Sequence, residues 1–322
     1  MKIAIIKLSS LGDIVHTVIV LQFIKKYCKA AEISWFVDEK FGSILDSHQD
    51  IKEVVKLPLK DKKFVKTYKI LSKFRNKFDI IIDFQGLIKS AIVGRILGKN
   101  VVGFDKLSVK EPLCSMLYST KINCDYNENI IIRNLTLASK ALDFKFNTNQ
   151  IDNKLPCFAA SDDDFDFLDK NSKNLLIAPF ASEKSKCYDK FKTVINGLKE
   201  CNILISFGSQ KEKEKALELT KNTHAKLLPA LSLNHMINLI NKVDLVIGND
   251  SGITHIAWAQ NRASITIFGN RPSRRNAYKT DKNIVLDAGK KVDAKCIDKS
   301  DFCVCDIDPN LVIKEAKRLL DE

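Results

Sequence analysis

Two short turns of this sequence combine small residues, a glycine and one aspartate. The first is Ser9-Ser10-Leu11-Gly12-Asp13, and the second is Asn249-Asp250-Ser251-Gly252. Both follow a short apolar run typical of a buried strand and precede apolar residues at helical spacing. A helix start presents free backbone N–H groups and the positive end of the helix dipole, so the turns predict anion sites, above all for phosphate. The alternative is an ordinary cap, in which the aspartates and Ser251 only satisfy the helix starts.

The elements around these turns alternate between strands and helices, which indicates the α/β class with parallel, doubly wound sheets. Before residue 145 we expect strands at 1–8, 32–37, 52–57, 78–84 and from 101, and helices at 14–27, 60–77 and 87–97. After residue 173 we expect strands at 174–179, 202–207, 243–247 and 264–268, and helices at 190–199, 211–220, 236–241, from 251 and at 310–320. The length suits two Rossmann-like domains, 1–160 and 161–322. If their sheets face each other, both turns open onto one interdomain cleft.

The connection between the domains, at 145–173, is rich in polar residues and contains the acidic run S-D-D-D-F-D-F-L-D-K at 161–170. This run predicts the acidic first turn of a linker helix. A D-x-D metal site at Asp164 and Asp166 is the alternative.

The composition, with 45% hydrophobic residues and a mean hydropathy of −0.11, is typical of a soluble globular protein. No apolar run approaches the roughly 18–20 residues of a transmembrane helix, and the N-terminal M-K-I-A-I-I-K-L lacks the layout of a signal peptide. The nine cysteines are scattered and odd in number, which predicts reduced thiols in a cytosolic protein. Cys296, Cys303 and Cys305 cluster without a nearby histidine, and a metal site there is the alternative to free thiols.

The formal net charge of +13 is unevenly distributed. Residues 1–160 carry 26 Lys and Arg against 16 Asp and Glu, and many of the basic residues crowd the segment 60–77. An excess of this kind predicts an anionic partner: a nucleic acid, a membrane surface or an acidic substrate. A solvated helix face is the alternative for the 60–77 segment.

Two nucleotide-binding motifs are absent from the sequence. A dinucleotide-binding fold would show G-x-G-x-x-G after its first strand, whereas the first turn has only Gly12, which argues against NAD or FAD. The sequence contains no G-x-x-x-x-G-K-[ST], which excludes a P-loop.

Four segments occur in order along nearly the whole chain: K-L-S-S-L-G-D-I-V-H-T at 7–17, D-F-Q-G-L-I-K-S-A at 83–91, K-E-P-L at 110–113 and N-D-S-G-I-T-H at 249–255. Together they resemble the bacterial ADP-heptose lipopolysaccharide heptosyltransferases of glycosyltransferase family nine, most closely the members that add the first heptose. The resemblance implies GT-B architecture, with an N-terminal domain for the acceptor and a C-terminal domain for the nucleotide sugar. It also allows the final helix to pack back on the N-terminal domain.

The implied activity is an inverting transfer of L-glycero-D-manno-heptose from ADP-heptose to Kdo of Kdo-lipid A, without a cofactor or an essential metal. The implied partners are ADP-heptose, Kdo-lipid A and an anionic membrane surface, and the implied place is the cytoplasmic face of the inner membrane. Addition of the second heptose, or of another sugar from a different nucleotide, is the nearest alternative. A nucleic-acid-binding protein is suggested by charge alone, but helix-turn-helix, zinc-finger and RNA-recognition signatures are lacking.

The resemblance also implies roles for single residues. Asp13 corresponds to the catalytic base, which deprotonates the acceptor hydroxyl. The residues implied for the donor are Ser9, Ser10, Gly12, Lys186, Glu212, Asp250, Ser251, Gly252 and His255, and those implied for the acceptor are Lys60, Lys63, Gln85 and Lys110.

Alternatives remain for two of these residues. Because Cys187-Tyr188-Asp189 departs from the family pattern after the lysine, Lys184 or Lys190 could be the counterpart of Lys186. His255 could equally be a buried structural histidine. Gly269-Asn270-Arg271-Pro272 replaces the usual glycine-proline-threonine turn of the family, which leaves the role of that loop open.

Overall fold

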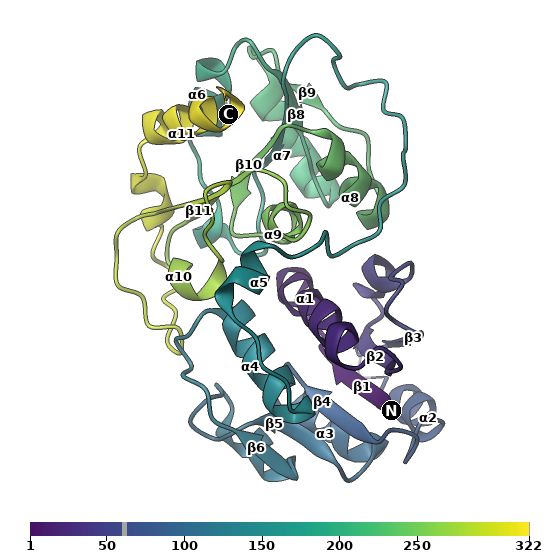
Figure 1. Cartoon of the computed structure of the whole chain (residues 1–322). Coiled ribbons are helices and arrows are strands. Elements are labelled where there is room, and N and C mark those ends of the chain that lie inside the picture. Colours follow the sequence, from purple (N-terminus) through teal and green to yellow (C-terminus); the bar gives the residue numbers. More distant parts are fainter. Residues whose placement is uncertain (60–62, 322) are drawn as a thin grey trace. The chain divides into compact units, whose positions relative to one another are not determined.

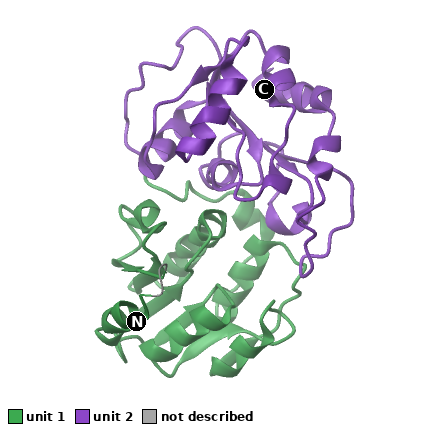
Figure 2. Cartoon of the chain, turned by 180° about the vertical axis from the view of Figure 1, so that it is seen from behind, with its two compact units in different colours: residues 1–159 green, residues 160–322 purple. Residues whose placement is uncertain are grey.

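The computed structural model describes residues 1–59 and 63–321 and divides into two compact units, 1–159 and 160–322 (Figures 1 and 2). Each unit contains one parallel six-stranded sheet. Among the described residues, no helix is both long enough and apolar enough to cross a membrane. The nine cysteines are free thiols in the structure.

Unit 1 is built on a sheet of strand order β3-β2-β1-β4-β5-β6. Its strands are β1 (Lys2–Ile6), β2 (Glu32–Asp38), β3 (Glu53–Leu57), β4 (Ile80–Asp83), β5 (Val101–Phe104) and β6 (Thr120–Ile122). Its helices are α1 (Leu11–Tyr27), α2 (Phe64–Ser72), α3 (Ile88–Leu97), α4 (Ile130–Leu142) and α5 (Thr148–Asp152), with the 3₁₀ turns η1 (Gly42–Leu45) and η2 (Pro112–Leu117). Helix α1 packs beside α4 (Figure 1). Helix α2 and the turn η2 pack beside α3. Right-handed crossovers place α1 and α3 on opposite faces of the sheet.

Unit 2 repeats this plan with the order β12-β11-β10-β7-β8-β9. Its strands are β7 (Asn174–Ala178), β8 (Asn202–Ile205), β9 (Lys226–Leu227), β10 (Leu245–Asn249), β11 (Ser264–Phe268) and β12 (Asn283–Asp287). Its helices are α6 (Phe191–Gly197), α7 (Gln210–Thr220), α8 (Leu233–Lys242), α9 (Gly252–Ala259), α10 (Ser273–Asn276) and α11 (Pro309–Asp321), with the 3₁₀ turns η3 (Lys184–Lys186) and η4 (Cys303–Asp306).

Both units have the strand order of the doubly wound Rossmann fold, which confirms the predicted fold class. Strands β4, β5, β7, β8, β10 and β11 are buried throughout, as continuous apolar runs predict for parallel strands covered on both faces. The strand order reverses between β1 and β4 in unit 1 and between β7 and β10 in unit 2. Ligands of such sheets bind beyond the carboxyl ends of the strands at this reversal. The turns after β1, β4, β7 and β10 are therefore the places to look for a site.

The basic helix expected at 60–77 is shorter than predicted. Helix α2 spans Phe64–Ser72, and Lys60 and Lys62 lie outside the described residues. After α2 the chain makes tight turns to Asn76, whose left-handed conformation (φ 57°) redirects it toward β4. A left-handed residue cannot continue an α-helix, so the basic residues after position 72 belong to a turn.

The linker helix predicted at 161–170 is wrong, because this acidic run is not helical. Its side chains are bound to α8 instead: Asn238 Nδ2 donates to Asp163 Oδ2 at 2.5 Å, and Lys242 Nζ lies 2.7 Å from Asp162 Oδ1. These contacts with α8 hold the segment in an irregular conformation.

The final helix, α11, uses its apolar side within its own unit. Val312, Ala316 and Leu319 belong to the core of unit 2, and α11 packs on α6. At the crossing, a Cβ on Gly197 would lie 2.4 Å from Ile313 Cδ1, so a larger residue there would require the Ile313 side chain to shift. Packing on the N-terminal domain is therefore not needed to bury this face.

Candidate active site

The first candidate turn, between β1 and α1, holds Asp13 in the first turn of α1. Asp13 Oδ2 accepts hydrogen bonds from the Ser10 backbone N–H at 3.0 Å and from Ser10 Oγ at 2.9 Å. Among the described residues, Asp13 Oδ1 has no hydrogen-bond partner. One carboxylate oxygen therefore caps the helix start, and the other is available to a ligand.

The surroundings of Asp13 favour its charged form. Burial opposes ionisation, but the positive charge of Lys7, the Ser10 amide and His16 outweigh it and hold the pKa of Asp13 below its usual value. Lys7 is itself buried and donates to the Phe84 carbonyl at 3.0 Å. Asp13 is therefore a carboxylate at neutral pH, which is the form that a general base requires.

Gln85 supports this turn from the neighbouring strand end. Its Oε1 accepts hydrogen bonds from the backbone N–H groups of Leu8, at 3.0 Å, and Ser9, at 3.1 Å. The side-chain NH₂ of Gln85 makes no hydrogen bond among the described residues. Gln85 was predicted to bind the acceptor, and the structure gives its oxygen a role in holding the first turn.

Asp83 fixes the backbone that carries Gln85. Asp83 Oδ1 accepts from the N–H groups of Gln85 (2.8 Å) and Gly86 (3.3 Å), and Oδ2 accepts from Ser90 Oγ (2.7 Å) and Tyr118 Oη (2.8 Å). Burial raises the pKa of Asp83, although these four donors favour its charged form. Gly86 has a positive φ of 67°, and an added Cβ would lie 3.0 Å from Val109, so the turn suits glycine.

Gln85→Ala is expected to lower both kcat and thermal stability. The change leaves two backbone N–H groups without an acceptor, at a cost of about 1–3 kcal/mol each, and it frees the turn that carries Asp13. Gln22→Ala is the matched control, because Gln22 also makes two hydrogen bonds to backbone, on Leu155, away from this turn. Melting and steady-state kinetics of both variants test the assignment. Equal kcat in the two variants would show that Gln85 contributes to stability alone.

Two of the three predicted acceptor lysines, Lys63 and Lys110, are described by the structure, and both are exposed. Lys63 immediately precedes α2, Lys110 precedes η2, and Lys60 lies outside the described residues. Glu111, next to Lys110, accepts a hydrogen bond from the Ile88 N–H at 2.8 Å, at the start of α3. The K-E-P-L segment is thereby joined to the D-F-Q-G segment within unit 1.

In unit 2, three predicted donor residues meet around one carboxylate. Asp250 lies at the end of β10, with Oδ2 2.6 Å from Lys186 Nζ and Oδ1 2.9 Å from His255 Nε2. Burial disfavours the charge on Asp250, but Lys186 and His255 outweigh it and hold the pKa of Asp250 well below its usual range. Asp250 is therefore an anion over the whole physiological pH range.

The structure distinguishes the three lysines of the loop after β7. Lys186 reaches Asp250, whereas Lys184 is exposed and Lys190 Nζ lies 3.4 Å from the Ile307 carbonyl. Asn249 holds this loop against β10, because it accepts from the Tyr188 N–H at 3.0 Å and donates to the Pro179 carbonyl at 2.7 Å. The neighbouring turns at the strand-order reversal of unit 2 thus bring one cation and one anion together.

The start of α9 carries an unused donor. Ser251 precedes Gly252 at the N-terminus of this helix, and its buried Oγ has no hydrogen-bond partner among the described residues. The first N–H groups of a helix also lack intrahelical partners. A hydroxyl and backbone N–H groups beside Lys186 and Asp250 can bind an anionic group such as a diphosphate.

Glu212, predicted to contact the nucleotide ribose, closes the turn after β8. Its Oε2 accepts from the Gly208 N–H at 2.7 Å, and Ser209 Oγ accepts from the Glu212 N–H at 3.3 Å. Glu212 Oε1 makes no hydrogen bond among the described residues. The first two contacts are those of a helix cap, so the structure assigns Glu212 at least that role.

The sequence did not predict the ion pairs that hold the lysine loop. Buried Arg271 lies 2.9 Å from Glu183 Oε2, and Lys299 approaches the same oxygen at 3.2 Å. Burial opposes the charge of Glu183, but these two cations lower its pKa. Glu183 immediately precedes η3, so the unassigned 269–272 turn anchors the segment that carries Lys186. The only sequence signal was the departure of this turn from the family pattern.

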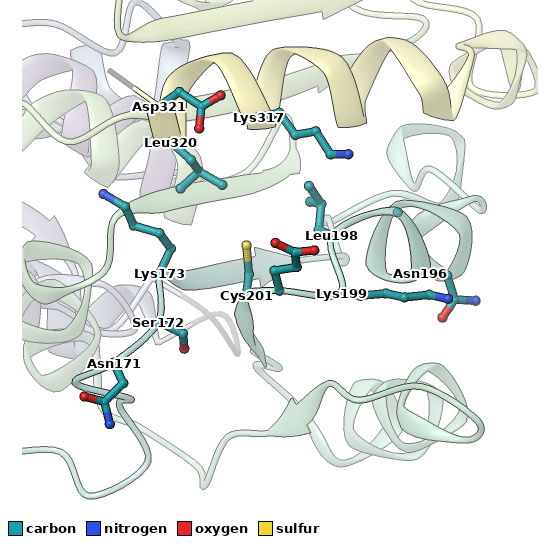
Figure 3. A pocket seen from close by; sticks show the side chains of 12 residues that line it. Asn171, Ser172, Lys173, Asn196, Leu198, Lys199, Cys201, Lys317, Leu320 and Asp321 are labelled. Carbon is teal, nitrogen blue, oxygen red and sulfur yellow. The ribbon is translucent and has the colours of Figure 1, made fainter.

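No group of three or more His, Cys, Asp or Glu in the described residues is arranged to hold a metal ion. A cavity of about 620 Å³ in unit 2 lies elsewhere, at the amino ends of β7 and β8, and is lined by Lys173, Cys201 and Lys317 among others (Figure 3). None of the predicted site residues lines it. The predicted site residues therefore lie away from this cavity, at the carboxyl ends of the strands.

Two doubly wound units with such turns are the architecture of the GT-B class, to which many glycosyltransferases belong. The model of glycosyltransferase family 9 (heptosyltransferase) matches residues 67–302. Lipopolysaccharide heptosyltransferase 1 of Campylobacter coli is 44% identical, with 100% of each chain covered. The chain therefore belongs to glycosyltransferase family 9.

Solved structures agree in fold. E. coli heptosyltransferase WaaC with ADP-2-deoxy-2-fluoro heptose has a TM-score of 0.74 at 20% identity, covering 99% of both chains. E. coli ADP-heptose lps heptosyltransferase II has a TM-score of 0.72 at 17% identity, covering 99% of this chain and 98% of that chain. WaaC and heptosyltransferase II therefore share the fold of this chain.

Proposed function

We propose that this enzyme transfers heptose from ADP-heptose to a Kdo residue of Kdo-lipid A, with inversion at the anomeric carbon. The observation that carries the proposal is the grouping of Lys186, Asp250 and the unpartnered Ser251 hydroxyl at the start of α9. This grouping suits a nucleoside diphosphate sugar, because it offers positive charge and N–H groups to the diphosphate and a carboxylate to the sugar hydroxyls. The 44% identical relative, a lipopolysaccharide heptosyltransferase 1, favours addition of the first heptose over the second.

The proposed mechanism uses Asp13 as the base. Asp13 removes the proton from the acceptor hydroxyl as the oxygen attacks the anomeric carbon of the donor, and the bond from that carbon to the diphosphate breaks. Lys186 and the N–H groups of α9 stabilise the charge that develops on the leaving ADP. We propose that these groups replace a metal in this role.

Product analysis tests the function. The enzyme is incubated with ADP-heptose and Kdo-lipid A, with and without EDTA, and the products are identified by mass spectrometry. We expect one added heptose in both reactions, and no reaction when the acceptor already carries that heptose. Transfer only to the heptosylated acceptor would contradict the first-heptose assignment, and loss of activity in EDTA that is restored by Mg²⁺ would contradict the metal-free mechanism.

Lys186→Ala is expected to raise the KM for ADP-heptose by roughly 10- to 150-fold, the effect of losing about 1.5–3 kcal/mol from a charge-assisted hydrogen bond. Lys184→Ala is the matched control, because Lys184 is an exposed lysine of the same loop. Steady-state kinetics with ADP-heptose as the varied substrate compare the two. An impaired Lys184 variant beside a normal Lys186 variant would assign the role to Lys184.

We also propose that the protein is peripheral on the cytoplasmic face of the inner membrane, where a glycolipid acceptor is embedded. Exposed Lys63, Lys66 and Lys69 on and beside α2 support attraction to anionic headgroups and to the acid groups of the acceptor.

A further inference from the structure

Large apolar side chains are exposed mainly in one part of unit 1. Eight of the fourteen that are exposed in the described residues lie between positions 64 and 116. Five of these are exposed by about two-thirds or more: Phe64 (69%), Val65 (71%), Leu107 (66%), Leu113 (65%) and Met116 (75%). Such exposure costs free energy in water, so a concentration of it indicates a surface that contacts something else.

Seven of these eight side chains come from three segments that lie side by side, α2, α3 and η2, and Leu107 lies in the loop between β5 and η2. Helix α3 packs against both α2 and η2. Lys89 Nζ on α3 donates to the Leu59 carbonyl ahead of α2 at 3.3 Å, and the Ile88 N–H donates to Glu111 Oε2 ahead of η2 at 2.8 Å. We call the shared surface the apolar face; it consists of Phe64, Val65, Tyr68, Ile88, Ile92, Leu107, Leu113 and Met116.

Each helix presents its apolar residues on one outer side. Phe64, Val65 and Tyr68 fall within one sector of α2, and Lys66 and Lys69 occupy the adjoining sector. On α3, Ile88 and Ile92 are one turn apart, with Lys89 and Arg95 beside them. Apolar residues flanked by basic ones are the pattern of helices that lie in a membrane interface.

The charge around the apolar face selects its partner. Residues 63–117 carry eleven Lys and Arg against four Asp and Glu. One of those acidic residues, Asp83, is fully buried, and a second, Asp105, accepts hydrogen bonds from Ser108 and Asn123. The surface is therefore apolar at its centre and strongly positive at its rim, which is complementary to anionic lipid headgroups above an acyl layer.

The apolar face begins beside the catalytic turn of the same unit. Ile88 follows Gln85 by three residues, and Gln85 holds the Leu8 and Ser9 backbone ahead of Asp13. Helix α3 thus starts at the same edge of the sheet at which α1 presents Asp13. A lipid anchored against this face would hold its head group near that edge.

We infer that the apolar face docks the enzyme on an anionic lipid bilayer, with the apolar side chains of α2, α3 and η2 entering the interface and the lysines binding headgroups. The inference rests on the proposed function in one respect, that the acceptor is a membrane glycolipid. It adds a hydrophobic contact, made by three separate segments, to the electrostatic attraction.

The test uses the triple variant Val65→Gln, Ile92→Gln and Met116→Gln, with one exposed residue from each segment. The matched control is Leu155→Gln, Leu217→Gln and Leu311→Gln, which removes three exposed leucines from other elements. Binding to sedimentable vesicles of phosphatidylglycerol and phosphatidylethanolamine is measured at low and high salt, together with transfer to vesicle-borne Kdo-lipid A and to a deacylated, water-soluble Kdo acceptor.

We expect the triple variant to bind vesicles about tenfold or more weakly, because apolar burial is lost, with the deficit persisting at high salt. Its rate with vesicle-borne acceptor should fall, whereas its rate with the soluble acceptor and all properties of the control should match wild type. Unchanged vesicle binding would overturn the inference. So would a dimer of the wild type, seen by analytical ultracentrifugation, that the triple variant disrupts while wild type fails to bind vesicles. If no heptose is transferred to either acceptor, the proposed function fails, but vesicle binding still decides the role of the face.

Discussion

Asp13→Asn is expected to lower kcat by about 10²- to 10⁴-fold, the range observed when a general base is lost. Asparagine keeps an oxygen that can accept from the Ser10 N–H and Oγ, so the cap of α1 and the fold should remain. Affinity for ADP-heptose should change little, because Asp13 is not among the residues implied for the donor.

Kinetics and a thermal melt of this variant distinguish the role of Asp13 as a general base from its role as the cap of α1. Asp79→Asn is a suitable control, because Asp79 accepts from the Lys2 N–H at the amino end of β1, away from the turn that carries Asp13. In wild type, the lowered pKa of Asp13 means that the base is lost only as the pH falls below its usual value of about 3.9. Turnover near the wild-type rate in the folded Asn variant would leave Asp13 with the role of a helix cap alone.

The sequence predicted the turns because their signals are local. A short apolar run, a break with glycine and a helical period identify a strand, turn and helix without reference to distant residues. The same logic located β1 and α1, β4 and α3, and β10 and α9, each within a few residues of its observed bounds. Asp13 and Asp250 follow from these assignments, because they lie at the carboxyl ends of central strands.

Helix α4 was missed although its signals are present. Asn129 caps it by accepting from the Ile131 N–H at 2.9 Å, and apolar residues recur through Ile130–Leu142 at helical spacing. The triple isoleucine at its start also fits a strand, and a short apolar run is ambiguous between the two. The prediction of a helix at 161–170 failed for the opposite reason. The local signal of this acidic run favoured a helix, but contacts with α8 determined its conformation.

The supporting residues of the site could not be predicted from local patterns. Gln85 lies 76 residues from Ser9 in the sequence, and their contact exists because β4 pairs directly with β1. Likewise, Arg271 reaches Glu183 from a loop that follows β11. Such contacts depend on strand order and loop shape, which a single sequence does not determine.

Asp250→Ala is expected to impair both the donor site and the stability of unit 2. The side chains of Asp250 and Lys186 are only 8% and 15% exposed, so the change leaves a largely buried ammonium without its partner. Removing one member of a buried pair costs about 3–5 kcal/mol. For a unit of this size, each kcal/mol lowers Tm by roughly 2–4 °C.

The pH dependence of stability is an independent test of the contribution of Asp250 to stability. The pKa of Asp250 is lower in the folded state than the usual value of about 3.9, so its contribution to stability is complete above that value and declines as the pH falls below it. Wild type should therefore lose more stability than the Asp250→Ala variant when the pH is lowered through this range.

The double variant Asp250→Ala, Lys186→Met separates structure from function. Methionine removes the stranded charge, so Tm at pH 7 should recover much of what the single variant loses. The KM for ADP-heptose should remain high, because both the cation for the diphosphate and the carboxylate for the sugar are gone. Thermal melts and donor kinetics on the single and double variants provide the comparison. A double variant that regains both wild-type stability and wild-type use of ADP-heptose would show that Lys186 and Asp250 form only a structural ion pair.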